Sequence, residues 1–296
     1  MTAKGLPAFF LWVGGALPPL ARLCVLSAAR AGFHTILFSD RHHDLPGSGI
    51  EQADFREIYS EYGPEDITIR GRPGPAYAAF SDVFRFALLA GQSGWWFDCD
   101  TLVLRPRQDF DELLAAQPFV IGRETPTMLN GAVIGSTDVA VPSLLLASTR
   151  ALLPELSKWG VIGPALISQK VACGEISADA LPIRAFYPVH HEDIGAIYQP
   201  ERRAEMEAAT QGSYCLSLWN EVLGQTGLRH VAPPAGSFLA ELLASRFGAT
   251  ELVTDDAALV DFLVSNKLRL DTLDSGAIAL RTILRKTRAR LGLDGQ

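Results

Sequence analysis

One stretch near the N-terminus decides the predicted fold: Phe9-Phe10-Leu11-Trp12-Val13-Gly14-Gly15. Five apolar residues closed by two glycines are typical of a buried strand that ends in a tight loop. Pro18 and Pro19 then open a helical stretch that runs to Arg30, and residues 35–38 form a second apolar run. A strand, a helix and a strand in this order predict a parallel sheet with helices on its faces.

The same alternation continues along the chain. Ser81 is placed to cap a helix over residues 82–90, because serine is a preferred helix N-cap. Further strands are expected at 95–97, 119–122 and 131–135, with residues 101–104 extended, and further helices at 141–153 and 164–171. The last third is expected to be mostly helical or irregular. We therefore predict an α/β fold, as a single domain over residues 1–250 and a helical C-terminal extension over residues 251–296.

Composition excludes several classes of protein. The chain has 296 residues, of which 48% are hydrophobic, and a formal net charge of −7. An acidic chain lacks the basic surface of a general nucleic-acid binder. The four cysteines are scattered and form no C-x-x-C pair, so reduced thiols packed as small hydrophobic groups are expected. Because no signal peptide or membrane span is evident, the sequence predicts a cytoplasmic protein.

Two acidic residues, Asp98 and Asp100, follow the apolar strand Trp95-Trp96-Phe97 directly. In open α/β sheets, ligands bind at the carboxyl ends of strands. Two carboxylates there repel each other unless a cation lies between them, and Mg²⁺ and Mn²⁺ prefer oxygen ligands together with substrate phosphates. The pair therefore indicates a metal that holds a diphosphate. The alternative is a polar turn with two solvated aspartates.

The residues around this pair resemble a known sequence block. They are Ser81-Asp82-Val83-Phe84-Arg85-Phe86, Gly94-Trp95-Trp96-Phe97-Asp98-Cys99-Asp100 and Leu102-Val103-Leu104-Arg105-Pro106. This order is similar to the "S-D-x-x-R … G-G-x-Y-x-D-x-D … P" block of the DXD-containing sugar transferases, which include bacterial and fungal mannosyl-, galactosyl- and capsule-sugar transferases and the glucosylating clostridial toxins. Ser93 and Trp96 depart from the block without removing a reactive group.

Two further segments carry the same resemblance, which spans roughly residues 9–245. The opening Leu11-Trp12-Val13-Gly14-Gly15 is similar to the family's "W-I-G-G", and residues 214–221 resemble its C-terminal "H-L-W-N" block. The resemblance implies a GT-A-like fold, a divalent cation (Mn²⁺ or Mg²⁺), a nucleotide-diphosphate sugar as donor, and retention of anomeric configuration. UDP is the nucleotide that the relatives favour, and a glycan, a lipid-linked sugar or another acceptor, as in polysaccharide biosynthesis, would receive the sugar.

The resemblance also implies roles for single residues. Asp98 and Asp100 would bind the metal, while Asp82 and Arg85, at positions i and i+3 of one helix, would hold hydroxyls of the donor sugar. Their alternative is an ordinary helix ion pair. Asn130 would lie near the scissile sugar. The remaining donor contacts that the resemblance implies are with Trp12, which would stack on the base, Gly14, Cys99, Trp219 and Asn220.

Ser217 is the main departure, because many relatives carry histidine there as a third metal ligand. The toxin branch resembles this chain in using serine, so Ser217 is expected to approach the metal directly or through water. A simple surface hydroxyl is the alternative. Both His42-His43-Asp44 and His190-His191 are expected to lie in solvated loops, because adjacent side chains on an extended chain point to opposite faces.

Near the C-terminus, basic residues alternate with apolar ones; the basic residues are Arg281, Arg285, Lys286, Arg288 and Arg290. A helix of this kind can rest on an anionic membrane, which would allow peripheral contact with the inner face of a membrane. A solvated terminal helix is the interpretation that we favour.

Two other functions compete with a glycosyltransferase. A metal-dependent hydrolase or nucleotidyltransferase could use the same acidic pair, but it would need a positioned base that activates water, and none is evident in the sequence. A non-catalytic or weakly hydrolytic sugar-nucleotide-binding protein is the second alternative, because the histidine expected as third metal ligand is missing.

Overall fold

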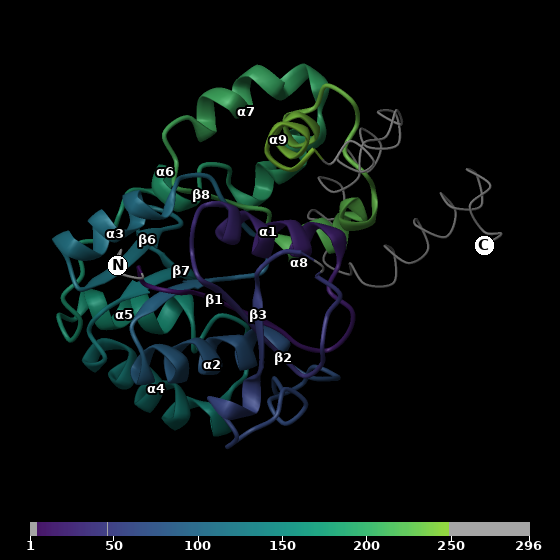
Figure 1. Cartoon of the computed structure of the whole chain (residues 1–296). Coiled ribbons are helices and arrows are strands. Elements are labelled where there is room, and N and C mark those ends of the chain that lie inside the picture. The colour runs from purple at the N-terminus through teal and green to yellow at the C-terminus, as the bar shows by residue number, and fades with distance from the viewer. Residues whose placement is uncertain (1–4, 46, 249–296) are drawn as a thin grey trace. The chain divides into compact units, whose positions relative to one another are not determined.

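The computed structural model describes residues 5–45 and 47–248, which are coloured in Figure 1. The described residues divide into two compact units. Unit 1 runs up to residue 190 and also includes residues 209–218, whereas the described part of unit 2 comprises residues 191–208 and 219–248. The predicted boundary at residue 250, the helical extension and the basic C-terminal segment all lie outside the described residues.

Unit 1 is built on a six-stranded sheet with the strand order β3-β2-β1-β4-β7-β6. These strands are β1 (Ala8–Trp12), β2 (Thr35–Ser39), β3 (Glu51–Asp54), β4 (Gly94–Phe97), β6 (Phe119–Arg123) and β7 (Leu129–Ser136). The first four strands in this order pair in parallel, and β7 runs antiparallel to both β4 and β6. The predicted α/β fold with a mainly parallel central sheet is confirmed.

Helices flank the sheet on both faces, as Figure 1 shows. In unit 1 they are α1 (Pro19–Arg30), α2 (Tyr77–Gly91), α3 (Arg107–Ala116), α4 (Ala140–Leu152), α5 (Pro164–Ala172), α6 (Ile183–Phe186) and the short 3₁₀ helices η1 (Phe55–Glu57) and η2 (Leu153–Glu155). Successive strand residues face opposite sides. Trp96 therefore packs against Phe84 of α2, and its neighbour Phe97 packs against Phe110 of α3.

Helix α2 begins earlier than the sequence suggested. It starts at Tyr77, so the expectation that Ser81 caps it is wrong. Ala79 and Phe80 are buried, and their burial extends the apolar face of the helix by a turn before Ser81. Because Ser81 lies inside the helix, its hydroxyl can accept a hydrogen bond from Arg85 one turn later, at 3.2 Å.

A second, two-stranded sheet in unit 1 joins two distant parts of the chain. Strand β5 (Thr101–Val103) pairs antiparallel with β8 (Cys215–Ser217). Thr101 lies opposite Ser217, and the amide of Val103 donates to the Ser27 hydroxyl of α1 at 2.8 Å. This pairing brings Ser217 beside the turn that carries Asp98 and Asp100, although more than a hundred residues separate them in sequence.

The described part of unit 2 is helical or irregular, as expected for the last third of the chain. Its elements are η3 (His191–Tyr198), η4 (Pro200–Arg202), most of α7 (Arg203–Thr210), α8 (Asn220–Thr226), η5 (Leu228–His230) and α9 (Phe238–Phe247). The Tyr198 hydroxyl donates to the carbonyl of Leu228 at 3.2 Å, and Ser237 caps α9 by accepting from Ala240. Within the described residues, none of the helices combines the length and apolar character that crossing a membrane requires.

Candidate active site

The turn after β4 places Asp98 at the carboxyl end of the sheet. The Asp98 amide donates to the carbonyl of Ala132 in β7 at 2.8 Å, and its own carbonyl accepts from the amide of Thr101 at 2.9 Å. The backbone is therefore tied on both sides of the turn. The Asp98 side chain is 30% exposed, so its carboxylate remains open to a ligand.

Arg85 is a buried cation that joins two acidic residues. Its Nη2 atom lies 3.0 Å from Oδ1 of Asp98 and 3.4 Å from Oδ1 of Asp82. The guanidinium carbon also lies 5.2 Å from the centroid of the Trp96 ring, and the Trp96 indole donates to Asp98 at 2.8 Å. The sequence predicted that Asp82 and Arg85 share a helix face, and the structure adds that both belong to one buried network with Asp98.

Asp82 is the most deeply enclosed carboxyl group of this network. The pKa of Asp82 is raised to about 6, mainly by burial and also by the nearby Asp98 charge, while the Arg85 cation opposes part of the rise. Gly163, at the start of α5, lies against this carboxyl group, since a Cβ atom there would be 2.5 Å from Asp82 Oδ2. Only glycine fits at residue 163, which explains why a glycine stands immediately before Pro164, the first residue of α5.

Asp98, Asp100 and Ser217 offer the oxygen ligands that a hard divalent cation takes. Asp100 is half-buried, and its carbonyl accepts from the amide of Leu218 at 2.7 Å, which ties the turn to β8. Ser217 is only 2% exposed, so the alternative that it is a surface hydroxyl is wrong. The buried hydroxyl of Thr101, opposite Ser217, has no hydrogen-bond partner within the described residues. The chemistry of this set fits Mn²⁺ or Mg²⁺.

Asn130 is held rigidly at the start of β7. Its Nδ2 donates to Oε2 of Glu124 at 2.8 Å, and its Oδ1 accepts from the amide of Ala132 at 2.8 Å. A Cβ atom on the next residue, Gly131, would lie 2.6 Å from Nη1 of Arg85, so Asn130 is adjacent to the arginine network. Sequence reasoning missed Glu124, because a glutamate in a turn-rich segment carries no pattern of its own.

Trp12 and Gly14 lie at the carboxyl end of β1. Trp12 is half-buried, and its indole donates to the carbonyl of Gly15 at 3.2 Å. Gly14 has a φ of +85°, and a Cβ atom there would lie 2.8 Å from the Tyr77 ring, so this position requires glycine on two grounds. An exposed Tyr77 ring beside Gly14 is a second aromatic surface near Trp12 that the sequence did not indicate.

His43 is buried beside the end of β2, so the expectation that it is solvated is wrong. It is 5% exposed, and its Nε2 lies 2.8 Å from the Ser39 hydroxyl, which also donates to the carbonyl of Trp12. Burial lowers the pKa of His43 below its usual value. His42 is exposed, as expected.

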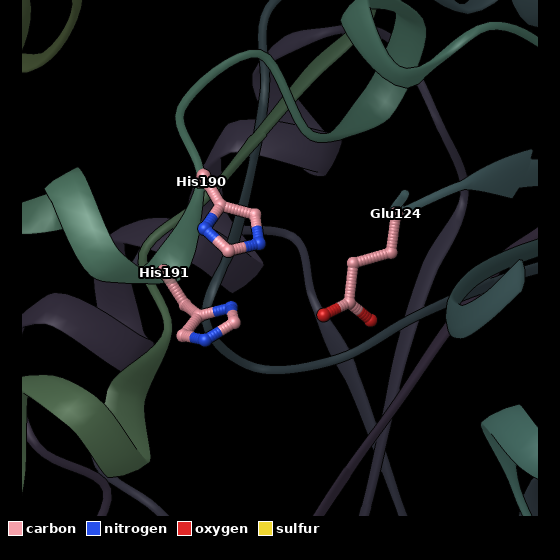
Figure 2. Close-up of side chains that lie close together, drawn as sticks. All are labelled: Glu124, His190 and His191. Carbon is pink, nitrogen blue, oxygen red and sulfur yellow. The ribbon is translucent and has the colours of Figure 1, made fainter. Parts of the chain in front are cut away.

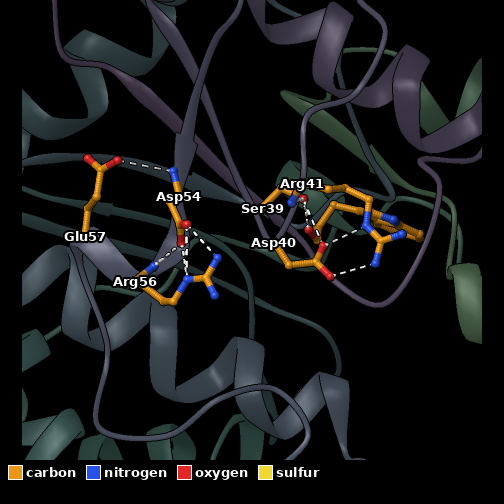
Figure 3. A network of polar contacts seen from close by, with 7 residues as sticks. Ser39, Asp40, Arg41, Asp54, Arg56 and Glu57 are labelled. Carbon is orange, nitrogen blue, oxygen red and sulfur yellow. Dashed lines mark hydrogen bonds and ion pairs between the residues drawn. The ribbon is translucent and has the colours of Figure 1, made fainter.

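The edge formed by the ends of β2 and β3 carries charged pairs that Figure 3 shows together. Asp40 pairs with Arg41 at 2.9 Å, and Asp54 pairs with Arg56 at 2.7 Å. The hydrogen bonds from these arginines lower the pKa of both carboxyl groups. These pairs are partly or fully exposed, and such pairs contribute little to stability.

Cys99 lies between the two aspartates and points into the protein. Its buried thiol donates to the carbonyl of Leu11 at 3.2 Å, and burial raises its pKa well above the usual value. A ligand bound at this turn could therefore contact the backbone of Cys99 but not its thiol. Cys24 and Cys215 are buried as expected, whereas Cys173 is exposed, which contradicts the expectation that all four thiols are packed inside.

Trp219 and Asn220 belong to unit 2. Trp219 has a φ of +51°, the only positive φ of a non-glycine residue in the described part of the chain. Such backbone strain persists only where surrounding contacts hold it. The His191 ring packs edge-on against the Trp219 ring at 5.5 Å, and the carbonyl of Asn220 accepts from Arg229.

Figure 2 draws Glu124 with the two adjacent histidines. Glu124 and His190 belong to unit 1, and His191 is the first residue of unit 2. A carboxylate oxygen of Glu124 and a ring nitrogen of His190 lie within 4.8 Å of each other. His190 lies outside the helices and strands and is half-buried, so it is only partly exposed to solvent.

Comparison with known proteins identifies one family and several distant structures. Residues 156–243 match the family model described as the alpha 1,4-glycosyltransferase conserved region. None of the curated proteins compared with the chain matches it.

Three solved structures show distant similarity. The glycosyltransferase GlyE of Streptococcus pneumoniae TIGR4 is 11% identical with a TM-score of 0.43, over 89% of this chain and 64% of that one. Mouse xyloside xylosyltransferase 1 is 11% identical with a TM-score of 0.41, over 60% and 86%. The PaToxG glycosyltransferase is 14% identical with a TM-score of 0.37, over 57% and 68%. The chain thus spans less than two thirds of the GlyE chain.

The family match confirms the prediction that the chain is a glycosyltransferase. The matched segment includes Gly163 and Ser217, both in unit 1, and lies after the acidic pair in sequence.

Proposed function

We propose that this glycosyltransferase transfers a sugar from a nucleotide-diphosphate donor, with UDP as the nucleotide, to a hydroxyl group of a glycan, a lipid-linked sugar or another acceptor. A DXD motif, Asp98 and Asp100, would hold the metal. The observation that carries the proposal is the buried Arg85, which joins Asp82 and Asp98 at the carboxyl end of β4. Such an edge is where α/β sheets bind ligands.

Different residues of unit 1 would bind the metal, the sugar and the base of the donor. Asp98, Asp100 and Ser217 would hold Mn²⁺ or Mg²⁺, which when bound neutralises charge on the two phosphates. Asp82 and Arg85 would donate hydrogen bonds to, or accept them from, hydroxyls of the sugar. Their ion pair with each other, and that of Arg85 with Asp98, fix the orientation of both side chains. Trp12 would stack on the base, and Asn130 would face the sugar beside Arg85.

The reaction exchanges one bond for another at the anomeric carbon of the sugar. The bond to the diphosphate oxygen breaks, a bond to the acceptor oxygen forms, and the proton of the acceptor hydroxyl passes to the released nucleoside diphosphate. We propose retention of configuration by attack from the same face as the leaving group, in accordance with the resemblance. Arg85 is positioned to stabilise negative charge near Asp98 in a buried setting, where electrostatic interactions are strengthened.

Calorimetry of nucleotide binding tests the proposal. UDP should bind in the presence of Mn²⁺ and lose at least about tenfold in affinity with excess chelator, because the diphosphate would otherwise face two carboxylates. A screen of nucleotide sugars for thermal stabilisation would then identify the donor, since a ligand that binds the folded state raises the apparent stability. Equal affinity with and without metal would contradict the metal role.

Donor turnover separates the proposal from a protein that only binds sugar nucleotides. Release of UDP from the donor identified in the screen should depend on Mn²⁺ and increase when an acceptor is present. Metal-dependent binding without any release of UDP would favour the non-catalytic alternative.

A further inference from the structure

Trp159 is unusually exposed for its size. Its side chain is 63% exposed, more than Tyr62, Tyr77 or Val139, the other large exposed hydrophobic residues within the described ranges. A tryptophan left in water forgoes the stabilisation that burial of its large apolar ring would provide. Single exposed apolar side chains are common on protein surfaces, so the place of Trp159 in the fold decides whether its ring is available to a ligand.

The loop that carries Trp159 is fixed on both sides. Before it, Leu156 is buried and its carbonyl accepts from the amide of Arg70 at 2.9 Å. After it, Ile162 is buried and its carbonyl accepts from the Thr149 hydroxyl at 3.3 Å. The exposure of Trp159 therefore results from a loop whose ends are anchored.

This loop ends at the candidate donor site. Gly163, four residues after Trp159, lies directly against the carboxyl group of Asp82. Four residues of chain span at most about 14 Å, which limits the distance between the Trp159 and Gly163 Cα atoms. Both residues belong to unit 1, so the Trp159 backbone lies within that distance of the glycine that contacts Asp82.

We propose that Trp159 is a stacking platform for a sugar ring of the acceptor, an inference that rests on the proposed glycosyltransferase function. A sugar ring has an apolar C–H face that can cover the indole, and hydroxyls that can bond to polar neighbours. Ser157 and Lys158, both exposed, provide such groups beside the ring. Binding sites for small ligands combine apolar or aromatic surfaces with a few polar groups in this way.

A carbohydrate fits this surface better than a protein or a membrane does. Tyr62, Tyr77 and Val139, the other large exposed hydrophobic residues within the described ranges, lie in other segments of the chain, so this loop presents a single large ring. Protein interfaces and membrane contacts need a wider apolar patch than one ring supplies. An acceptor that ends in a carbohydrate needs only one or two sugar rings to be held next to the donor.

The experiment compares wild-type protein with Trp159→Ala on an array of immobilised glycans, in the presence of UDP and Mn²⁺. We expect wild type to be retained on a subset of glycans and Trp159→Ala to lose at least about tenfold in retention on that subset, as aromatic anchors do. Trp159→Tyr should keep most of it. Val139→Ala is the matched control, because Val139 is 47% exposed and follows the end of β7 opposite to Asn130.

Two further measurements keep the outcomes distinct. The melting temperature of Trp159→Ala should stay near that of wild type, since the side chain is exposed, and its affinity for UDP with Mn²⁺ should be unchanged. If wild type binds UDP but no glycan, or if Trp159→Ala retains the same glycans equally, the platform is disproved and the proposed function stands. If wild type fails to bind UDP with metal, the proposed function itself fails.

Discussion

Two acidic residues share Arg85, yet their surroundings are opposite. Asp82, on helix α2, is almost completely enclosed, whereas Asp98, in the turn after β4, is 30% exposed. Removal from water makes the negative charge of Asp82 costly, and the arginine compensates for it only in part. Asp98 keeps contact with solvent and can accept a new ligand. Asp82 is therefore suited to hold a sugar hydroxyl in a fixed position, whereas Asp98 is suited to bind a cation that comes and goes.

The largest expected effect comes from removing the negative charge of either aspartate in the turn after β4. Asp98→Asn and Asp100→Asn should each lower transfer by at least about a hundredfold, because they remove charge where the diphosphate and its cation would bind. The measurement is kcat/KM at limiting Mn²⁺, together with the melting temperature. The melting temperature should change little for Asp100→Asn and should fall for Asp98→Asn, which loses an ion pair with the buried Arg85.

A second half-buried aspartate controls for loss of charge alone. Asp109 of helix α3 pairs with Arg105, which precedes the helix, and Asp109→Asn should leave transfer unchanged. Turnover at the wild-type rate by either Asp98→Asn or Asp100→Asn would remove the metal role.

The second-largest expected effect tests whether the pairing with both Asp82 and Asp98 requires an arginine at position 85. Arg85→Lys keeps the positive charge but replaces a planar fork by a single ammonium group. We expect kcat/KM to fall about ten- to a hundredfold, as when a group that positions a ligand is lost. Arg105→Lys, in a partly buried ion pair with Asp109, is the matched control. If lysine supports normal turnover, a point charge is sufficient and the geometry of the fork is irrelevant.

The burial of Asp82 should be detectable in the pH dependence of the free energy of unfolding. The folded protein holds the Asp82 proton more tightly than the unfolded chain, because burial raises its pKa from the usual 3.8 to about 6. Its contribution to stability is therefore greatest at low pH and decreases as pH rises from about 4 to about 6. That rise in pKa corresponds to at most about 3 kcal/mol.

The measurement is the difference in unfolding free energy between wild type and Asp82→Asn across this range. Asparagine does not titrate, so relative to the variant, wild type should become less stable as pH rises. Subtracting the two curves removes the opposite trend of carboxyl groups whose pKa is lowered, such as those of Asp40 and Asp54. Parallel curves would mean that Asp82 titrates normally.

The smallest expected effect concerns Ser217. In a Mn²⁺ titration with UDP present, Ser217→Ala should weaken the metal midpoint by a few fold, since a hydroxyl is a weak ligand beside two carboxylates. Stability should change by about 1 kcal/mol or less. Ser213→Ala is the control, because Ser213 is also buried and precedes β8. If the two variants have the same midpoint, Ser217 does not contribute to the metal site.

Local patterns in the sequence were sufficient to predict most of the sheet. Strands β1, β2 and β4 were predicted because each contains a short apolar run followed by glycine or polar residues. Strand β3, with the sequence Glu-Gln-Ala-Asp, was missed because an edge strand in contact with water carries no apolar run. The start of α2 was misplaced because a capping residue type was given more weight than the buried face before it.

For the site, the sequence by itself determined which chemical groups are present and that Asp82 and Arg85 share a helix face, because neighbours on one element follow from its period. Only the tertiary structure decided that Arg85 also reaches Asp98, that Ser217 is buried opposite Thr101, and that Gly163 closes over Asp82. These contacts join residues from 13 to more than 100 positions apart. Such distances are set by strand pairing and packing, and no local pattern encodes them.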